Sequence, residues 1–299
     1  MTANTSVART LRRYEHSTMT RRRFTSAGGV FLTGACAGVS AIVLLFLLGY
    51  VALQGAHALN LAFLTQLPKP VGERGGGVAN GIVGSMIIVG IATLIATPIG
   101  VLTGAFIALF ARGIVAETVR FLADVLSGIP SITIGLFAYT LLVAPLKHFS
   151  AVSASFAFAV LMLPVIIRTS EQAILSVPIA IREGALALGL SVYTSTTHIV
   201  LAAARPAIVT GLLLAVARIT GETAPLLFTA FGSQFWELNP TNPMAELSLQ
   251  VFTYAISPYQ SWHEQAWAGA LVLIFAVFAL NLVARFAWSR KTGIPGPGR

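Results

Sequence analysis

The 299-residue sequence has a single cysteine and few charged residues. The lone Cys36 excludes an intrachain disulfide framework and a metal site built from several thiolates. Charged residues make up 10% of the chain, against about 25% in a typical soluble domain. Hydrophobic residues make up 56%. This composition is typical of an integral membrane protein with several spans, whose core is bounded by lipid.

The sequence also lacks a phosphate-binding loop of the G-x-x-x-x-G-K-[ST] type. The lysines are followed by proline, histidine or threonine, and Lys291 is preceded by arginine instead of glycine. The five histidines form no pair with metal-ligand spacing on an expected helix. We therefore expect no catalytic activity, no cofactor and no metal on this chain. If it takes part in active transport, the energy comes from a partner.

Long hydrophobic runs predict an all-α membrane protein with six transmembrane helices. The first covers 27–53, and five more lie within 79–287. The second, 81–111, is expected to be interrupted at Pro98, and the third, 121–144, is expected to break at 127–131. The fifth is expected at 206–232. Flanking segments 1–26 and 288–299 are expected to be basic tails, the first of them flexible.

The distribution of positive charge predicts the orientation. Most of the nineteen Lys and Arg residues fall in the tails or in loops on the same side of the expected bundle, whereas Lys69, Arg74 and Lys147 fall on the other side. By the positive-inside rule, both termini are cytoplasmic. The net charge of +9 is then a consequence of topology and of contact with anionic lipids, and does not indicate nucleic-acid binding.

Two charged residues interrupt the fifth expected span. Arg218 and Glu222 are four residues apart, which places them on one face of a helix. Arg218 follows Pro206 by twelve residues, or about 18 Å of rise, near the middle of a bilayer core of about 30 Å. A charge there costs about 2.5–3.5 kcal/mol, and Pro225 is expected to kink or open the helix beside it. The combination favours a site that faces a cavity over an ion pair that only neutralises itself.

The cytoplasmic segment 171–205 predicts two short helices. Pro178 suits the start of the first helix and Gly189 its C-terminal stop, while Ser191 suits the cap of the second. Such a unit is either a rigid knob that fits a groove on a partner protein or a hairpin lying on the membrane surface. The residue pattern alone leaves both interpretations open.

The same segment resembles the EAA signature of ABC-importer permeases. In this sequence Gly184 replaces the alanine at the second position of the signature, and Ala202 stands where the family often has proline. The resemblance implies the type I importer permease (MetI-like) fold and a loop that docks into a cleft of the ATPase. The residues that it implicates in coupling are Glu183, Gly184, Ala185 and Gly189.

A second resemblance narrows the family. The run R-I-T-G-E-T-A-P-L at 218–226 is similar to that of phosphate-specific ABC transporter permeases of the PstA type, and runs near 76–85 and 127–137 are similar as well. The likeness covers about 76–287. It implies a permease subunit of an ATP-driven phosphate importer in the bacterial cytoplasmic membrane. The implied partners are a sister permease of the PstC type, a PstB-type ATPase dimer and an extracytoplasmic PstS-type phosphate-binding protein.

The chemistry of an anion path makes Arg218 the candidate substrate ligand, because guanidinium pairs with two oxygens of an oxyanion and stays charged. Glu222 repels phosphate when ionised, so we expect it to pair with Arg218 when the path is empty or to be partly protonated. Thr220 and Thr223 can add hydrogen bonds, although packing is the more ordinary role for them.

Three alternatives remain open on the sequence. The substrate can be another oxyanion, such as molybdate, sulfate or phosphonate. An ion-driven secondary transporter belongs to another class, and such folds show paired repeats with two broken spans; no second R-x-x-G-E run is present. A membrane-embedded sensor or scaffold is the third.

Overall fold

The computed structural model describes residues 3–70, 73 and 75–289. Over these residues the chain is helical, with one isolated backbone bridge between Phe231 and Met244. It divides into two compact units, Met1–Leu53 and Gln54–Arg299.

The first unit is formed by helix α1 (Ala3–Ala56), whose part Ser26–Ala56 is long and apolar enough to cross a membrane. The flexible tail expected over 1–26 is therefore wrong for residues 3–26, which are helical. The sequence gives the reason, since neither glycine nor proline occurs between residue 3 and Gly28 to end the helix.

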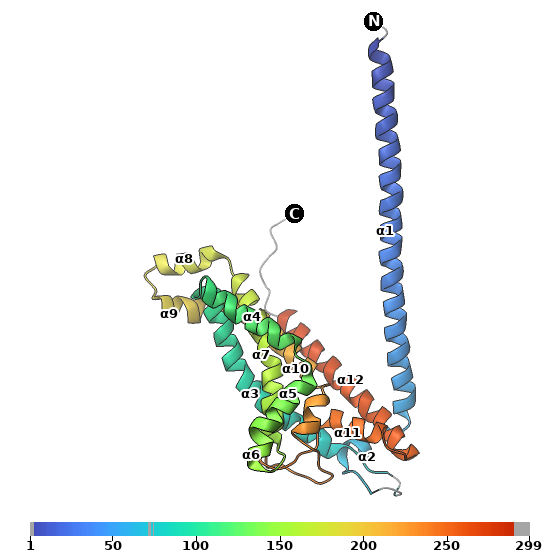
Figure 1. Ribbon diagram of the computed structural model, residues 1–299, viewed down its shortest axis with the longest axis vertical. Helices are drawn as coiled ribbons and strands as arrows, with labels where there is room; N and C mark the ends of the chain where they lie inside the picture. The colour runs from blue at the N-terminus through green and yellow to red at the C-terminus, as the bar shows by residue number, and fades with distance from the viewer. Residues whose placement is uncertain (1–2, 71–72, 74, 290–299) are drawn as a thin grey trace. The chain divides into compact units, whose positions relative to one another are not determined.

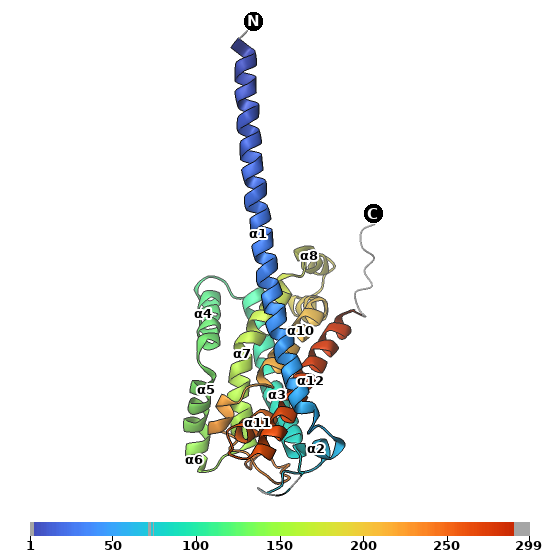
Figure 2. The ribbon, with the colours of Figure 1, turned by 90° about the vertical axis from the view of Figure 1, so that its right-hand side faces the viewer.

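Four more single helices of the described chain can span a bilayer: α3 (Ala79–Leu109), α7 (Ala151–Leu175), the continuous helix Val192–Ile219 and the Gln260–Val283 part of α12 (Gln260–Ser289). A sixth span is formed if α4 (Ile114–Gly128) and the helix Ser131–Leu146 count as one bent pair, with 99° between them. The second half consists of α5 (Ser131–Ala138), the π turn η1 (Tyr139–Val143) and α6 (Ala144–Leu146). The expected break at 127–131 is confirmed, and Figure 2 shows α4, α5 and α6 following one another along one edge of the second unit.

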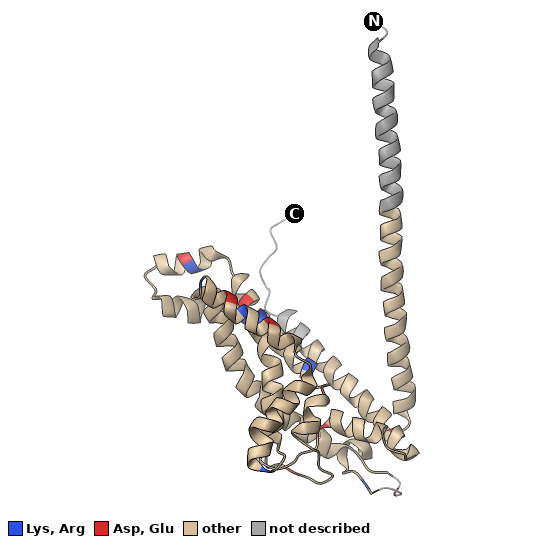
Figure 3. Cartoon of the chain, in the orientation of Figure 1, with Lys and Arg blue, Asp and Glu red and all other residues tan. Residues whose placement is uncertain are grey.

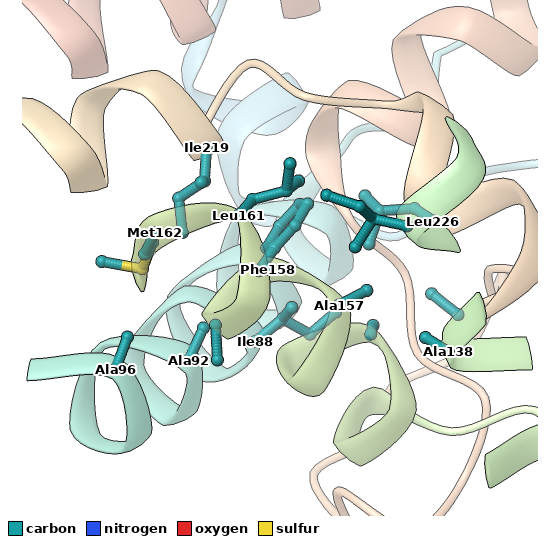
Figure 4. Packing of buried hydrophobic residues seen from close by; sticks show 14 of the residues in the cluster. Ile88, Ala92, Ala96, Ala138, Ala157, Phe158, Leu161, Met162, Ile219 and Leu226 are labelled. Carbon is teal, nitrogen blue, oxygen red and sulfur yellow. The ribbon is translucent and has the colours of Figure 1, made fainter. Parts of the chain in front are cut away.

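Helix α7 lies at the centre of the second unit and packs against α3, as Figure 4 shows for their buried side chains. The two helices approach closely at Gly104, where a Cβ would come within 2.8 Å of the Ile167 carbonyl oxygen. Helix α3 is not interrupted at Pro98, contrary to expectation, because neighbouring helices stabilise a membrane helix that has lost one hydrogen bond. Among the labelled core residues, α3 contributes Ile88, Ala92 and Ala96, and α7 contributes Ala157, Phe158, Leu161 and Met162.

The fifth expected span is wrong at both ends. The helix begins with α9 (Val192–Thr194), passes through the π turn η2 (Ser195–Val200) and continues as α10 (Leu201–Ile219) without a break at Pro206. It ends thirteen residues before the expected 232, and the chain then forms the short 3-10 helix η3 (Ala224–Phe228).

The second unit has two distinct ends (Figure 1). Helix α8 (Ile179–Ala187) and α9 project from one end, while α2 (Leu61–Thr65) and α11 (Leu247–Ala255) lie at the other. Figure 3 shows most charged residues near α4 and α8 and in the loops of the opposite end, with long tan stretches of helix and few charged residues between them. A band of mostly uncharged helix is what a bilayer requires.

Candidate functional site

The helix that carries Arg218 ends before it reaches Glu222. Helix α10 ends at Ile219, and the backbone N–H of Glu222 donates to the Ile219 carbonyl at 3.0 Å. Pro225 lies in the first turn of η3, so the expected opening beside it is confirmed. The expected placement of Arg218 and Glu222 on one helix face is wrong. Gly221 favours the helical state weakly, and Pro225 has no N–H to bond the Gly221 carbonyl, so the helix cannot continue at low cost.

The four predicted substrate-path residues have different environments. Arg218 is exposed, Glu222 and Thr223 are half-buried, and Thr220 is buried. In the described part of the chain, Arg218 forms no ion pair, so the expected Arg218–Glu222 pair is absent. The Thr220 hydroxyl donates to the Val216 carbonyl at 2.8 Å, which uses its one proton. Among the described residues, no carboxylate therefore occupies the guanidinium of Arg218.

The segment after the opening is held from two sides. On one side it rests on α5, because a Cβ on Gly135 would lie 2.6 Å from the Pro225 Cα. On the other side the Ser248 hydroxyl lies 3.0 Å from the backbone carbonyl oxygen of Glu222. Ser248 in turn lies beside the fully buried Glu246. Contacts with α5 and with Ser248 therefore stabilise the opening beside Arg218.

Glu246 is a residue that sequence reasoning missed. It caps the N-terminus of α11 and accepts hydrogen bonds from the Ser85 hydroxyl at 2.9 Å and from the Leu249 N–H at 3.0 Å. Burial raises the pKa of this carboxyl group, and its hydrogen bonds oppose that rise. A glutamate in the polar segment that follows the expected fifth span gave no signal of burial, since N-caps are usually serine, threonine, asparagine or aspartate.

The predicted helix signals of the EAA-like segment are confirmed. Pro178 precedes α8, and Gly189 follows it with a φ of 82°. The N–H of Gly189 donates to Leu186 and that of Leu190 to Ala185, the two hydrogen bonds of a Schellman stop. The Ser191 hydroxyl accepts from the Thr194 N–H at 3.1 Å and caps the next helix.

The exposed surface of α8 and α9 forms a knob. Of the four residues predicted to couple to a partner, Glu183, Gly184 and Gly189 are exposed and Ala185 is buried. Three large apolar residues in the same segment are also exposed: Ile179 (71%), Leu188 (85%) and Tyr193 (74%). An apolar knob at a charged end of the molecule suits a groove on a partner protein. From the base of this knob, one continuous helix, Val192–Ile219, runs to Arg218.

A cluster of ion pairs lies near the same end and was also missed. Glu171 is 1% exposed and bonds the Arg120 guanidinium at 2.6 Å and that of Arg168 at 3.2 Å. Arg168 also bonds Asp124 at 2.8 Å. Glu171 was assigned to the loop 171–205, but α7 continues to Leu175, so this part of the loop prediction is wrong. The cluster ties α4 to α7.

Comparisons with known proteins identify the class first. Residues 96–288 match the family profile of binding-protein-dependent transport system inner membrane components. A chain of the MetNI methionine ABC transporter in an inward-facing conformation has the same fold, with a TM-score of 0.56 at 17% identity over 71% of this chain and 93% of that one. A second crystal form gives 0.55 at 16% identity, over 72% of this chain and 94% of that one. The expected all-α, MetI-like importer permease fold is confirmed.

Relatives with a higher sequence identity than these structures identify the family within this class. A phosphate transport system permease protein PstA of Yersinia pestis is 41% identical over 83% of this chain and 84% of its own length. Its namesake from Haemophilus influenzae is 43% identical over 85% of this chain and 91% of its own. A probable PstA of Methanocaldococcus jannaschii is 30% identical over 86% and 92%. The chain belongs to the PstA family of permeases.

Proposed function

We propose that this chain is the membrane-spanning permease subunit of an ATP-driven importer of inorganic phosphate. Its relatives at 41–43% identity bear the name of phosphate transport permeases. The observation that carries the proposal is Arg218, exposed and without an ion pair in the described chain, at the end of a long apolar helix. Phosphate is an anion near pH 7, and a guanidinium bonds two of its oxygens at once.

Arg218 and Glu222 have separate roles in this proposal, because the helix ends between them. Arg218 binds the substrate oxygens, while Glu222, half-buried and no longer on the same helix, repels phosphate when ionised. That repulsion favours release, which transport requires as much as binding. Thr223 keeps a hydroxyl for the substrate, whereas Thr220 contributes packing, because its proton is bonded to Val216.

The energy comes from a partner, because the sequence has no phosphate-binding loop. ATP and Mg²⁺ bind to an ATPase dimer of the PstB type, and the knob of α8 and α9 docks into it through Glu183, Gly184, Ala185 and Gly189. The continuous helix Val192–Ile219 carries the movement of the knob to Arg218. ATP is cytoplasmic, so the α8 end of the second unit faces the cytoplasm of a bacterial inner membrane, with both chain termini on that side.

The remaining partners complete the path. Arg218 is exposed on this chain, so one wall of the path belongs to another subunit, a sister permease of the PstC type. Phosphate arrives from a PstS-type binding protein at the opposite end, where the loops 54–78 and 233–259 lie around α2 and α11.

Uptake of radiolabelled phosphate tests the function in a strain that lacks this chain and its other phosphate routes. The wild-type gene restores uptake, and Arg218→Ala and Glu222→Gln abolish it while assembly is unchanged. Arg218→Ala removes a charge-assisted pair of hydrogen bonds, so the loss is about tenfold or more. Arg205→Ala is the matched control, because Arg205 is also exposed on α10. Normal uptake by both site variants rejects the site assignment.

Competition and purification separate the alternatives. Excess unlabelled phosphate suppresses the uptake, whereas molybdate, sulfate and phosphonate do not; suppression by one of these alone identifies a different oxyanion as the substrate. Purification of the tagged chain brings down an ATPase and a sister permease. Absence of an ATPase, together with uptake that ionophores abolish, supports a secondary transporter instead.

A further inference from the structure

A buried carboxyl group joins three elements around the opening of α10. Glu246 is 0% exposed and receives the Ser85 hydroxyl of α3 on one oxygen. Its other oxygen lies 2.6 Å from the Ser248 hydroxyl and 3.0 Å from the Leu249 N–H. The Ser248 hydroxyl also lies 3.0 Å from the backbone carbonyl oxygen of Glu222. Through this one serine, Glu246 is linked to the segment that follows Arg218.

The charge state of Glu246 follows from comparing the contacts that need a proton with the protons that are available. Four contacts need a proton: Ser85 to Glu246, Leu249 to Glu246, Ser248 to Glu246 and Ser248 to Glu222. With an ionised Glu246 there are three protons, because the Ser248 hydroxyl has one and cannot donate to both oxygens. A protonated Glu246 supplies the fourth. It donates to the Ser248 oxygen, which then donates to the Glu222 carbonyl, and every contact is satisfied.

In the part of the chain that the structure describes, Glu246 forms no salt bridge with a Lys, Arg or His side chain. The titratable neighbours are Glu222, which follows α10, and Tyr254 of α11, which lines the same cavity. Helices α3 and α12 present the uncharged Ser85 and Trp262.

A cavity lies beside Glu246. Glu246 is one of the residues that line this cavity of about 220 Å³ at the α11 end of the second unit. Pro68, Gln234 and Gln250 also line it. The buried carboxyl group therefore lies next to a space that polar side chains share.

We propose that Glu246 is a positioning residue that carries a proton and, through Ser248, holds the backbone carbonyl of Glu222 beside the substrate site. Loss of the proton draws the Ser248 hydroxyl back to the carboxylate at 2.6 Å and releases that carbonyl. The effect on transport rests on the proposed function, whereas the protonation of Glu246 does not. Uptake therefore declines as pH rises through the range in which Glu246 loses its proton.

Infrared spectroscopy of the purified complex tests the protonation directly. A protonated carboxyl group has a carbonyl stretch that is separate from the bands of a carboxylate. We expect this band at neutral pH in the wild type and its loss in Glu246→Gln. Glu237→Gln is the matched control, since Glu237 lies in the same outer loop, is only partly buried and accepts hydrogen bonds from Asn239 and Asn242. An unchanged band in Glu246→Gln overturns the proposal.

The pH profile of phosphate uptake tests the positioning role. The amide of Glu246→Gln still donates to Ser248 but loses the Leu249 bond and cannot titrate, so we expect lower uptake without the decline at high pH. In Ser248→Ala the relay is gone, and uptake is low at every pH whether residue 246 is Glu or Gln. Wild-type and Glu246→Gln profiles of the same shape overturn the role. If the wild type itself takes up no phosphate, the proposed function fails, and the infrared result still decides whether Glu246 is protonated.

Discussion

Gly135 of α5 lies directly against Pro225 of η3, and a Cβ at Gly135 would come within 2.6 Å of the Pro225 Cα and 3.0 Å of its carbonyl oxygen. The two breaks in the spanning helices thus meet: the turn at Ile129 and Pro130, which starts α5, and the opening after α10. Because each broken element is short, each depends on the other for its packing. The segment after Arg218 therefore lies where η3 and α5, two short elements that follow breaks in the backbone, pack against each other.

We expect Gly135→Ala to displace η3 and to reduce phosphate uptake by about tenfold or more. The new methyl group meets backbone atoms of Pro225, which cannot move aside as a flexible side chain can, and overpacking of this kind costs about 1–3 kcal/mol. Gly90→Ala is the matched control, since a Cβ at Gly90 of α3 has no heavy atom within 4 Å. Uptake measured beside membrane abundance separates a local defect from loss of the protein. Equal uptake by both variants contradicts the packing argument.

The EAA-like loop gives a second pair of glycine variants. Gly189 has a φ of 82°, a conformation that costs an L-residue about 1–2 kcal/mol, so Gly189→Ala should loosen the stop of α8. We expect weaker co-purification of the ATPase and lower substrate-stimulated ATP hydrolysis. Gly184→Ala serves as the control, because its Cβ enters open space and a helical alanine is favoured there. A Gly189→Ala complex with normal coupling would show that the stop is dispensable.

The sequence predicted those features that local backbone chemistry determines. Pro178, Gly189 and Ser191 bound the short helices because their signals act within one turn. The break at 127–131 and the opening near Pro225 followed from the missing N–H of proline. Hydropathy located the apolar helices because the thickness of the bilayer sets the length of each apolar run.

The errors arose where distant residues decide. Hydropathy predicted that the fifth span continues through Glu222. In the structure the helix ends earlier, and the chain forms η3, which packs on Gly135 of α5. Glu171 was placed in a loop by the sequence, but it forms an ion pair with Arg120 of α4. Glu246 gave no signal of burial, but it accepts a hydrogen bond from Ser85 of α3. Partners separated by many residues have no signature in a single sequence.

The ion cluster predicts unequal costs for two acidic residues. Glu171 is 1% exposed and bonds two arginines, so Glu171→Gln should lower the free energy of unfolding by about 3–5 kcal/mol. Asp124 is 58% exposed and bonds Arg168 alone, so Asp124→Asn should cost about 0–1 kcal/mol. Thermal unfolding of the purified complex in detergent measures both. Similar midpoints for the two variants would show that the cluster does not stabilise the contact between α4 and α7.

The dependence of stability on pH follows from the buried Glu246. Its pKa in the folded chain is raised above the ordinary value of 4.5, chiefly by burial. A group with a raised pKa contributes stability that is complete below about 4.5 and is lost as pH rises through the folded pKa. We therefore expect the unfolding midpoint of the wild type to fall with rising pH above that value, and this component to be absent in Glu246→Gln.

Glu237 provides a control of opposite sign for the same measurement. Hydrogen bonds from Asn242 and Asn239 lower the pKa of this exposed carboxyl group, so its small contribution is present above about 4.5 and is lost as pH falls. Glu237→Gln should therefore leave the descent at higher pH intact and alter only the acidic limb. If Glu246→Gln shows the same descent as the wild type, another group controls it, and the buried carboxyl group does not titrate with folding.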